Sequence, residues 1–447
     1  GLLEKGNVAG LHDSEFASKF VACASLTALW RFVESSMGLT LNTHVAQITF
    51  RAASDMMAID STTARLLELV TDVRYRRERG SMFSMFACRT PGGARLLRQS
   101  LLQPLATKGA IEERQVAVEV LLGREQLFYE IQRLLPAVGD VDLLAARLAT
   151  EPKTHGQQWC KAAIRTAIRL RHALAALPLL AEALKAPGVE ASALLQEAHN
   201  VFRHARFPAL LEELDRVLDS DEPHSLESKG SLAHVVLMYA VRPSVCALLD
   251  IARQTWNDAL EQIHALHRSY AVKYPELNIK LEFTERRGWY LSHTSQSAPP
   301  EFLRTEAKGT SGRHMSTSKE LSSENFKLRQ AEREILVQTV SVLGGLYTVL
   351  RAEAPLLYQV SHTASTLDLI QAFVGYTLLL GVYTRPVMSE EPSAPIAIKS
   401  ARHPLMERIL CQDEAASGFE PLDFYIGEGC HFQTVTGANG GGKSTYL

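Results

Sequence analysis

The residue types best suited to chemistry lie near the end of the chain, where Gly437 to Ser444 fit the phosphate-binding pattern G-x-x-x-x-G-K-[ST]. Glycines let backbone N–H groups point at phosphate oxygens without a Cβ in the way. We expect Lys443 to reach the β- and γ-phosphates of a nucleotide and Ser444 to offer its hydroxyl to Mg²⁺. The pattern therefore predicts ATP and Mg²⁺ as cofactors; a glycine-rich turn that fits by chance is the alternative. The expected cofactor contacts in this loop are Gly437, Ala438, Asn439, Gly440, Gly441, Gly442, Lys443, Ser444 and Thr445.

A strand and a helix must position this loop. Residues 432–436 have the composition of a short strand that leads into it, and the following helix would direct its positive N-terminal end at the same anion. A P-loop ATPase also needs a second strand ending in an acidic residue, which holds Mg²⁺ and places water. No such strand follows Leu447, and the chain starts at Gly1 without Met. We therefore expect a fragment of a longer protein, which by itself hydrolyses ATP poorly.

Composition limits the classes of protein that need to be considered. The 447 residues are 46% hydrophobic and 21% charged, as in a soluble globular protein of roughly two to four domains. The net charge of −2 gives no overall nucleic-acid signature, so any DNA binding must come from local patches. The six cysteines are scattered with no C-x-x-C pair, which argues against a disulfide scaffold or a zinc site. The most apolar stretch, residues 173–184, is too short to span a membrane.

Most of residues 11–375 have the apolar spacing of helices. Residues 14–33 and 62–73 place apolar side chains three and four apart, and Asp60 is a candidate N-cap. Short apolar runs within residues 46–59 are candidate strands. Residues 110–216 are rich in Ala, Leu, Glu and Arg, which predicts several packed helices. The turns between them are expected at Pro136, Pro152 and Pro187.

A segment of different character, roughly residues 271–324, separates two long helical patterns. The first runs from residue 243 to 267 and the second starts after Phe326. Between them, residues 279–284 alternate apolar and polar as a half-buried strand does, and residues 289–291 form a return strand. The rest of the segment is expected to form loops and short strands. The pattern predicts a small mixed domain inserted between two helical arms.

At this point the chain resembles the MutS family of DNA mismatch-repair and recombination proteins. Residues 436–447 resemble that family's T-G-P-N-x-x-G-K-S-T-Y stretch, with Ala438 in place of its usual proline. The order and spacing of the similar elements cover nearly the whole chain. Further similar elements are residues 57–60 with 67–69 at the start of the core, residues 89–98 with 103–105, which resemble T-x-x-G-x-R-L-L-R…P-L, and residues 397–404 at the opening of the ATPase domain.

The resemblance implies a multi-domain, mainly α fold. A long helical lever and core domain would carry an inserted small α/β clamp domain, and the start of a truncated P-loop α/β ATPase domain would follow. The implied division is residues 1–45 for the end of a connector leading into the core, 46–270 for the core and lever, 271–325 for the clamp, 326–385 for the returning lever helices and 386–447 for the incomplete ATPase domain.

Within the family, the chain resembles the meiotic branch, on residues 239–242, 250–255 and 300–303. That implies a nuclear, chromosome-associated protein that pairs with MutS homologue five, binds double-stranded and branched DNA such as Holliday junctions, and favours crossovers. Two alternatives remain open. One is a mismatch-repair member of the family, which reads mispaired bases, and the other is an interaction scaffold whose P-loop is degenerate.

The resemblance also implies site residues. Phe419 has the spacing of the aromatic residue that stacks on adenine, although an ordinary core or surface Phe would have the same sequence. His403 is expected to be structural, and the basic run Arg74, Arg76, Arg77 and Arg79 is expected to be a solvated helix end. Trp289 and Tyr290 are interleaved with cations of the inserted domain, which suit phosphate contacts, or else ordinary surface charge. The main DNA-binding candidates are Lys280, Arg286, Arg287, Arg304, Lys308 and Arg313, with Lys273 and Lys319 beside them.

Overall fold

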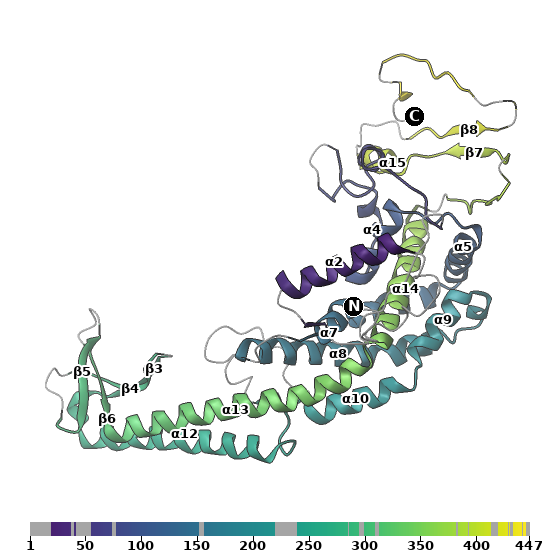
Figure 1. Cartoon of the computed structure of the whole chain (residues 1–447). Helices are drawn as coiled ribbons and strands as arrows, with labels where there is room; N and C mark the ends of the chain where they lie inside the picture. The colour runs from purple at the N-terminus through teal and green to yellow at the C-terminus, as the bar shows by residue number, and fades with distance from the viewer. Residues whose placement is uncertain are drawn as a thin grey trace.

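A computed structural model gives the protein a helical body, a long arm and a small C-terminal ribbon (Figure 1). The arm leaves the body at one end and carries a small sheet at its tip, while the ribbon lies beyond the opposite side of the body. The structure describes residues 19–36, 40–41, 55–73, 77–151, 156–219, 239–284, 286–294, 299–308, 313–380, 383–391, 393–412, 419–427, 429, 432–439 and 441–443.

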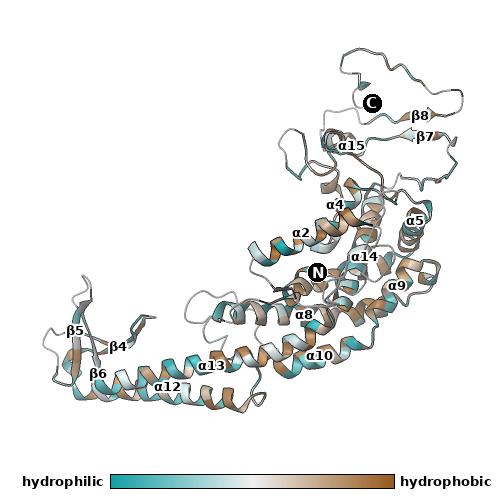
Figure 2. Cartoon of the chain, viewed as in Figure 1, coloured by the Kyte–Doolittle hydropathy of each residue, from teal (hydrophilic) through white to brown (hydrophobic). Residues whose placement is uncertain are grey.

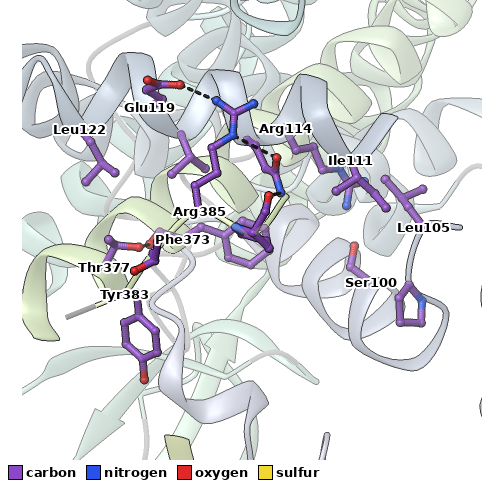
Figure 3. A pocket seen from close by; sticks show the side chains of 15 residues that line it. Ser100, Leu105, Ile111, Arg114, Glu119, Leu122, Phe373, Thr377, Tyr383 and Arg385 are labelled. Carbon is purple, nitrogen blue, oxygen red and sulfur yellow. Dashed lines mark hydrogen bonds and ion pairs between the residues drawn. The ribbon is translucent and has the colours of Figure 1, made fainter. Parts of the chain in front are cut away.

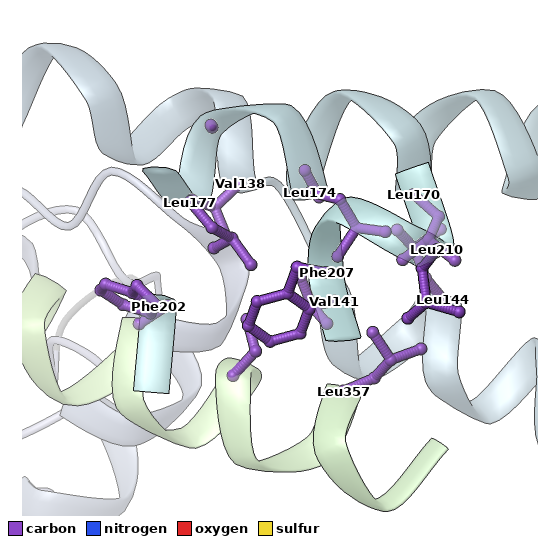
Figure 4. Close-up of a cluster of buried hydrophobic side chains, with 14 of the residues drawn as sticks. Val138, Val141, Leu144, Leu170, Leu174, Leu177, Phe202, Phe207, Leu210 and Leu357 are labelled. Carbon is purple, nitrogen blue, oxygen red and sulfur yellow. The ribbon is translucent and has the colours of Figure 1, made fainter. Parts of the chain in front are cut away.

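The body is a set of packed helices around one apolar core. Leu and Ala recur on the inner faces of these helices, so the buried side chains of several helices interdigitate. Figure 4 shows Phe207 of one helix between Leu174 of a second and Leu357 of a third, and Phe207 is 2% exposed. The helices of the body are α4 (Pro91–Leu102), α5 (Lys108–Leu122), α6 (Glu125–Val138), α7 (Val141–Ala149), α8 (Gln157–Ala183), α9 (Ala193–Phe202), α10 (Arg206–Val217) and α14 (Ala354–Leu380).

Of the three turns expected at prolines, the one at Pro136 is wrong. Pro136 lies inside α6, close to its end at Val138, and Pro178 lies inside α8. A proline removes one backbone hydrogen bond, and the apolar packing of these helices offsets that loss. Pro187 does lie between helices, after α8, while Pro152 lies outside the described residues.

The region before the body is less regular than predicted. Helix α3 (Ser61–Leu66) begins as expected, because the Asp60 carboxylate accepts hydrogen bonds from the N–H groups of Thr62 and Thr63. The helix predicted to reach residue 73 stops at Leu66, and Glu68 adopts a positive φ of 51°. Met56 forms only an isolated bridge to Leu105, and residues 46–54 lie outside the described residues. A separate exposed helix, α2 (Phe20–Ser36), fits the expected helix over residues 14–33.

The arm consists of two long antiparallel helices, α12 (Ala247–Lys273) and α13 (Lys319–Ala352). At 1.5 Å per residue, α13 extends about 50 Å. Polar and apolar residues alternate turn by turn along both helices (Figure 2). The second helix begins at Lys319 and not after Phe326 as predicted, because Ser318 caps it by accepting a hydrogen bond from the Leu321 N–H. Among the described helices, α13 alone is apolar and long enough to cross a membrane, and its buried face packs on α12 and α8.

The segment between the arm helices forms a four-stranded antiparallel sheet, which we call the tip sheet. Its strand order is β3-β4-β6-β5, and Leu291 and Phe302 pack from it against Leu321 of α13. The expected strand at 279–284 and its return strand are confirmed, and the following region, expected to form loops and short strands, contains two further strands. The strands are β3 (Lys280–Thr284), β4 (Gly288–His293), β5 (Phe302–Lys308) and β6 (Arg313–Ser318).

The C-terminal part contains strand β7 (Ile396–Ala401), helix α15 (Pro404–Gln412) and strand β8 (Leu422–Ile426). The two strands pair antiparallel and form a ribbon. Residues 432–436, predicted to be a strand, are extended but belong to no strand. A strand requires a hydrogen-bonded neighbour along its backbone. The Gln433 side chain donates to the Tyr425 carbonyl and ties this segment to β8.

Candidate functional site

The phosphate-binding motif forms a loop whose lysine folds back over its own start. The Lys443 Nζ donates hydrogen bonds to the carbonyl oxygens of Gly437 at 2.6 Å and Ala438 at 2.7 Å. Gly442 has a φ of +83°, which only glycine adopts without strain, and the Gly441 N–H donates to the Ala438 carbonyl. The ammonium group therefore lies at the loop, where phosphate oxygens could replace these exposed carbonyl contacts. Gly440, Ser444 and Thr445 lie outside the described residues.

The other residues predicted near the nucleotide are placed with less detail. Phe419 is half-buried in the extended segment that leads into β8, and its contact with adenine stays a prediction. Asn439 is an exposed residue of the loop. His403 precedes α15, and its Nδ1 accepts a hydrogen bond from the Met406 N–H at 3.4 Å, which agrees with the structural role expected for it.

The basic side chains of the tip sheet differ in how accessible they are to a ligand. Lys280 on β3 and Arg286 in the turn before β4 are exposed. Arg287 pairs with Glu306 at 2.6 Å, and both side chains are about half-exposed, so this pair holds the arginine only weakly. Arg304 and Lys308 lie on β5, and their side chains lie outside the described residues.

Arg313, by contrast, is a structural part of the tip sheet. Its guanidinium donates to the Ser292 hydroxyl at 2.8 Å, to the Ser292 carbonyl at 2.6 Å and to the Asn278 carbonyl at 2.8 Å. A guanidinium that satisfies these groups cannot reach a phosphate without leaving them unpaired. Of the two neighbouring cations, Lys273 is paired with Glu301 at 2.5 Å, and Lys319 is exposed at the start of α13.

The aromatic residues interleaved with these cations are mainly structural. Tyr290 is 7% exposed and donates a hydrogen bond to Glu282, and burial raises the pKa of its hydroxyl, as does Glu282. The Trp289 ring contacts Phe283 and His264. The most exposed of the described aromatic residues at the tip is Phe326 on α13, which is 69% exposed, while Phe283 on β3 is 43% exposed. Sequence reasoning missed Phe326, although a phenylalanine among polar residues on the outer face of a predicted helix was a usable signal.

The basic run of residues 74–79 does not form a binding site in its described part, residues 77–79. Arg77 and Arg79 are exposed, and residues 74–76 lie outside the described residues. Glu78 pairs with Arg98, whose guanidinium lies 5.0 Å from the Phe83 ring centroid. The described part of the run is exposed, as expected, but it does not end a helix as predicted, because α3 stops at Leu66.

The T-x-x-G element of the sequence joins α4 to α14 through a buried carboxylate. Asp368 of α14 has no exposed surface and accepts hydrogen bonds from the Arg89 N–H at 2.8 Å, the Thr90 N–H at 2.7 Å and the Thr90 hydroxyl at 2.6 Å. The Thr90 hydroxyl in turn accepts from the Gly93 N–H and caps α4. A Cβ on Gly93 would overlap the Asp368 carboxylate, so this contact requires glycine. The sequence analysis did not single out Asp368.

A pocket of about 600 Å³ lies where α14 passes into the extended segment toward the ribbon (Figure 3). Its floor is mainly apolar, with Leu105, Ile111 and Phe373 among its lining residues. Arg385 of the extended segment crosses to α5, where it donates to Glu119 at 2.6 Å and to Gln115 at 3.1 Å. These contacts fasten the segment that leads to the ribbon onto the body.

The sequence of this chain is similar to those of known proteins. A family model described as MutS domain III matches residues 62–373. The human protein named MutS protein homolog 4 is 29% identical over 442 residues, which cover 97% of this chain and 45% of that protein. The Arabidopsis thaliana protein named DNA mismatch repair protein MSH4 is 28% identical over 97% of this chain and 56% of its own length. The Thermotoga petrophila DNA mismatch repair protein MutS is 25% identical over 99% of this chain and 50% of its own length. The chain spans about half the length of the curated relatives it matches.

Proposed function

The chain belongs to the MutS family, and we propose that it acts as an ATP-binding DNA clamp of that family's meiotic branch. It would bind double-stranded and branched DNA, including Holliday junctions, and favour crossovers. It would act as a heterodimer with MutS homologue five, in the nucleus and on chromosomes. The similarity to proteins named MutS homolog 4 over nearly the whole chain supports this choice of branch.

The observation that carries the proposal is the arm with its tip sheet. Two helices hold the sheet away from the body, and exposed cations, Lys280 and Arg286, lie on it (Figure 1). Phosphate contacts need cations that can reach a DNA backbone, and they carry no sequence information. A protein that recognises the shape of a branched DNA needs contacts of this kind. An arm longer than the DNA is wide could close around it as a clamp.

The loop at the C-terminal end supports ATP as the cofactor. Gly442 has the backbone conformation that such a loop needs, and the Lys443 ammonium already lies against the carbonyls at its start. These described residues fit a phosphate group. Lys443 and the loop glycines would hold the phosphates, and Ser444 would hold Mg²⁺. ATP bound here would supply a charge-dense ligand whose presence favours one arrangement of the domains that contact it.

A second candidate is mismatch repair within the same family. The observation that favours it is the match to bacterial proteins named DNA mismatch repair protein MutS over nearly the whole chain. Both candidates use the same arm and loop, and they differ in the DNA that is preferred. The choice of DNA in the experiment therefore separates them.

The test is DNA binding by the protein co-expressed with MutS homologue five, measured by fluorescence anisotropy at several salt concentrations. A four-way junction, a plain duplex and a mismatched duplex are compared, each with and without ATP and Mg²⁺. We expect preference for the junction, and we expect ATP to change the lifetime of the complex. Lys443→Ala should abolish the ATP effect while leaving DNA binding without ATP intact.

Arginine variants test the tip sheet in the same assay. Replacing Arg286 and Arg287 by Gln should weaken binding to all DNAs and reduce the salt slope by about two, or about one per arginine. Arg133→Gln, an exposed arginine on α6, is the matched control and should change nothing. Preference for the mismatch would move the protein to the repair candidate. DNA binding that ignores both ATP and Lys443→Ala would favour the scaffold alternative.

A further inference from the structure

A cleft of about 500 Å³ lies between the tip sheet and the first turns of α13, and we call it the tip cleft. Its walls come from β4 and the turn before it, from β5 and β6, and from one face of α13. Its lining residues include three arginines and a single carboxylate, Glu306, so its charge is positive. This volume lies in the range of pockets that hold small ligands, and it is too small for a double helix.

The cleft is built as a rigid site. The Asn325 side chain of α13 donates to the Trp289 carbonyl at 2.8 Å and accepts from the Trp289 N–H at 2.9 Å. The Arg329 guanidinium donates to the Arg286 carbonyl at 3.1 Å. Gly288, with a φ of +81°, lets the chain turn tightly against Asn325. The turn that carries Arg286 and Arg287 is thus held on α13 from two points, which fixes the backbone under both arginines before any ligand arrives.

An aromatic ring stands beside these cations. Phe326 lines the cleft and is 69% exposed, although an isolated phenylalanine gains nothing by facing water. Arg287 is held only by its exposed pair with Glu306, and a phosphate can compete for such a pair. An aromatic face next to cations is the arrangement by which proteins bind single-stranded nucleic acid, with bases stacked on the ring and phosphates on the basic groups.

We propose that the tip cleft binds an unpaired nucleotide of DNA, with its base on Phe326 and its phosphate on Arg286 and Arg287. In a paired duplex every base is already stacked, so this site would select DNA with unstacked bases, as found at branch points and single-stranded gaps. The inference rests on the proposed DNA-binding function. It adds a separate preference for unpaired DNA, which phosphate contacts alone would not produce.

The test uses the full chain co-expressed with MutS homologue five, a labelled oligothymidine of about 12 nucleotides and a duplex of the same length, measured by anisotropy. Phe326→Leu keeps an apolar side chain but removes the aromatic face, so binding of oligothymidine should weaken about tenfold while duplex binding stays unchanged. Phe326→Trp should restore it. Val337→Ala, which alters another exposed apolar residue of α13, is the matched control. A 2-aminopurine base in the oligonucleotide should lose fluorescence on binding the unaltered protein but not on binding Phe326→Leu.

The outcomes separate this inference from the proposed function. Binding of both DNAs with no effect of Phe326→Leu would overturn the nucleotide site and leave the clamp proposal standing. Equal weakening of duplex and oligothymidine by Phe326→Leu would also overturn it, because the ring would then support the fold of the tip. Binding of neither DNA by the unaltered protein would overturn both proposals. Displacement of bound oligothymidine by a phosphoserine peptide at lower concentration than by unlabelled oligothymidine would assign the cleft to a phosphorylated protein instead.

Discussion

The tip sheet and the β7–β8 ribbon are both antiparallel, yet they differ in what covers them. The tip sheet packs one face on α12 and α13, and Leu291 at its centre has no exposed surface. On the ribbon, Ile396, Ile398 and Leu422 are 58%, 48% and 55% exposed. Both sequences alternate or cluster apolar residues as strands do. The difference shows that a strand pattern specifies a hairpin locally, whereas the stability of the sheet comes from the layer that packs against it.

Hydrogen exchange should give the largest contrast between the two regions. Amides of β4 are held in a covered sheet, so they should open only with the arm. Amides of β7 and β8 should exchange faster by several orders of magnitude, because a two-stranded ribbon with both faces exposed is marginally stable. Mass-spectrometric exchange over seconds to hours measures this, with α14 as the protected reference. Comparable protection of the β4 and β8 amides would contradict the expected difference in stability between the two regions.

Truncation of one leucine in each region should differ by several kcal/mol. Leu291→Ala removes a fully buried side chain and should destabilise the arm tip by about 2–5 kcal/mol. Leu422→Ala removes an exposed one and should change stability by less than about 0.5 kcal/mol. Urea unfolding followed by circular dichroism and by exchange at the tip provides the measurement. Equal effects of the two substitutions would show that the ribbon is buried as deeply as the tip sheet in solution.

Two glycine substitutions extend the comparison to the body as a third region. Gly93→Ala places a Cβ against the buried Asp368 carboxylate and should cost about 1–3 kcal/mol. Gly345→Ala in α13 meets no atom within 4 Å and should instead stabilise by about 0.4–1 kcal/mol. Thermal unfolding of both variants gives the two signs. A stabilising Gly93→Ala would mean that α4 and α14 are not joined through Asp368.

The smallest expected effect is a dependence of the arm tip on acid. Hydrogen bonds from its own backbone N–H, from Tyr270 and from Ser318 hold the pKa of Glu320 below its ordinary value. A lowered folded pKa stabilises the protein above the ordinary carboxyl value, and that contribution disappears as pH falls through the lowered value. Glu320→Gln lacks this contribution at every pH, so its tip should be slightly less protected than the unaltered tip at pH 7. The two proteins should converge as pH falls to about 3, because the unaltered Glu320 is then protonated. An identical acid profile in the two proteins would contradict this assignment.

The sequence predicted elements well where a single helix or hairpin determines its own pattern. The long amphipathic period gave α12 and most of α13, and the alternation of residues 279–284 gave β3. Prediction from the sequence failed where a tertiary contact determines the local structure. Pro136 is accommodated inside α6 by packing, and residues 432–436 have no neighbouring strand among the described residues. Among site residues, Arg313 could not be told from Arg286 by type, since only the fold directs its guanidinium to the Ser292 and Asn278 carbonyls.

The central claim, that DNA is held at the tip sheet, is tested most directly by photocrosslinking. A benzoylphenylalanine in place of Arg286 is compared with one in place of Arg133 on α6, each with a labelled four-way junction. The account predicts covalent DNA adducts from position 286, lost as salt is raised, and none from position 133. Adducts from position 133, or none from position 286 while the junction remains bound, would contradict it.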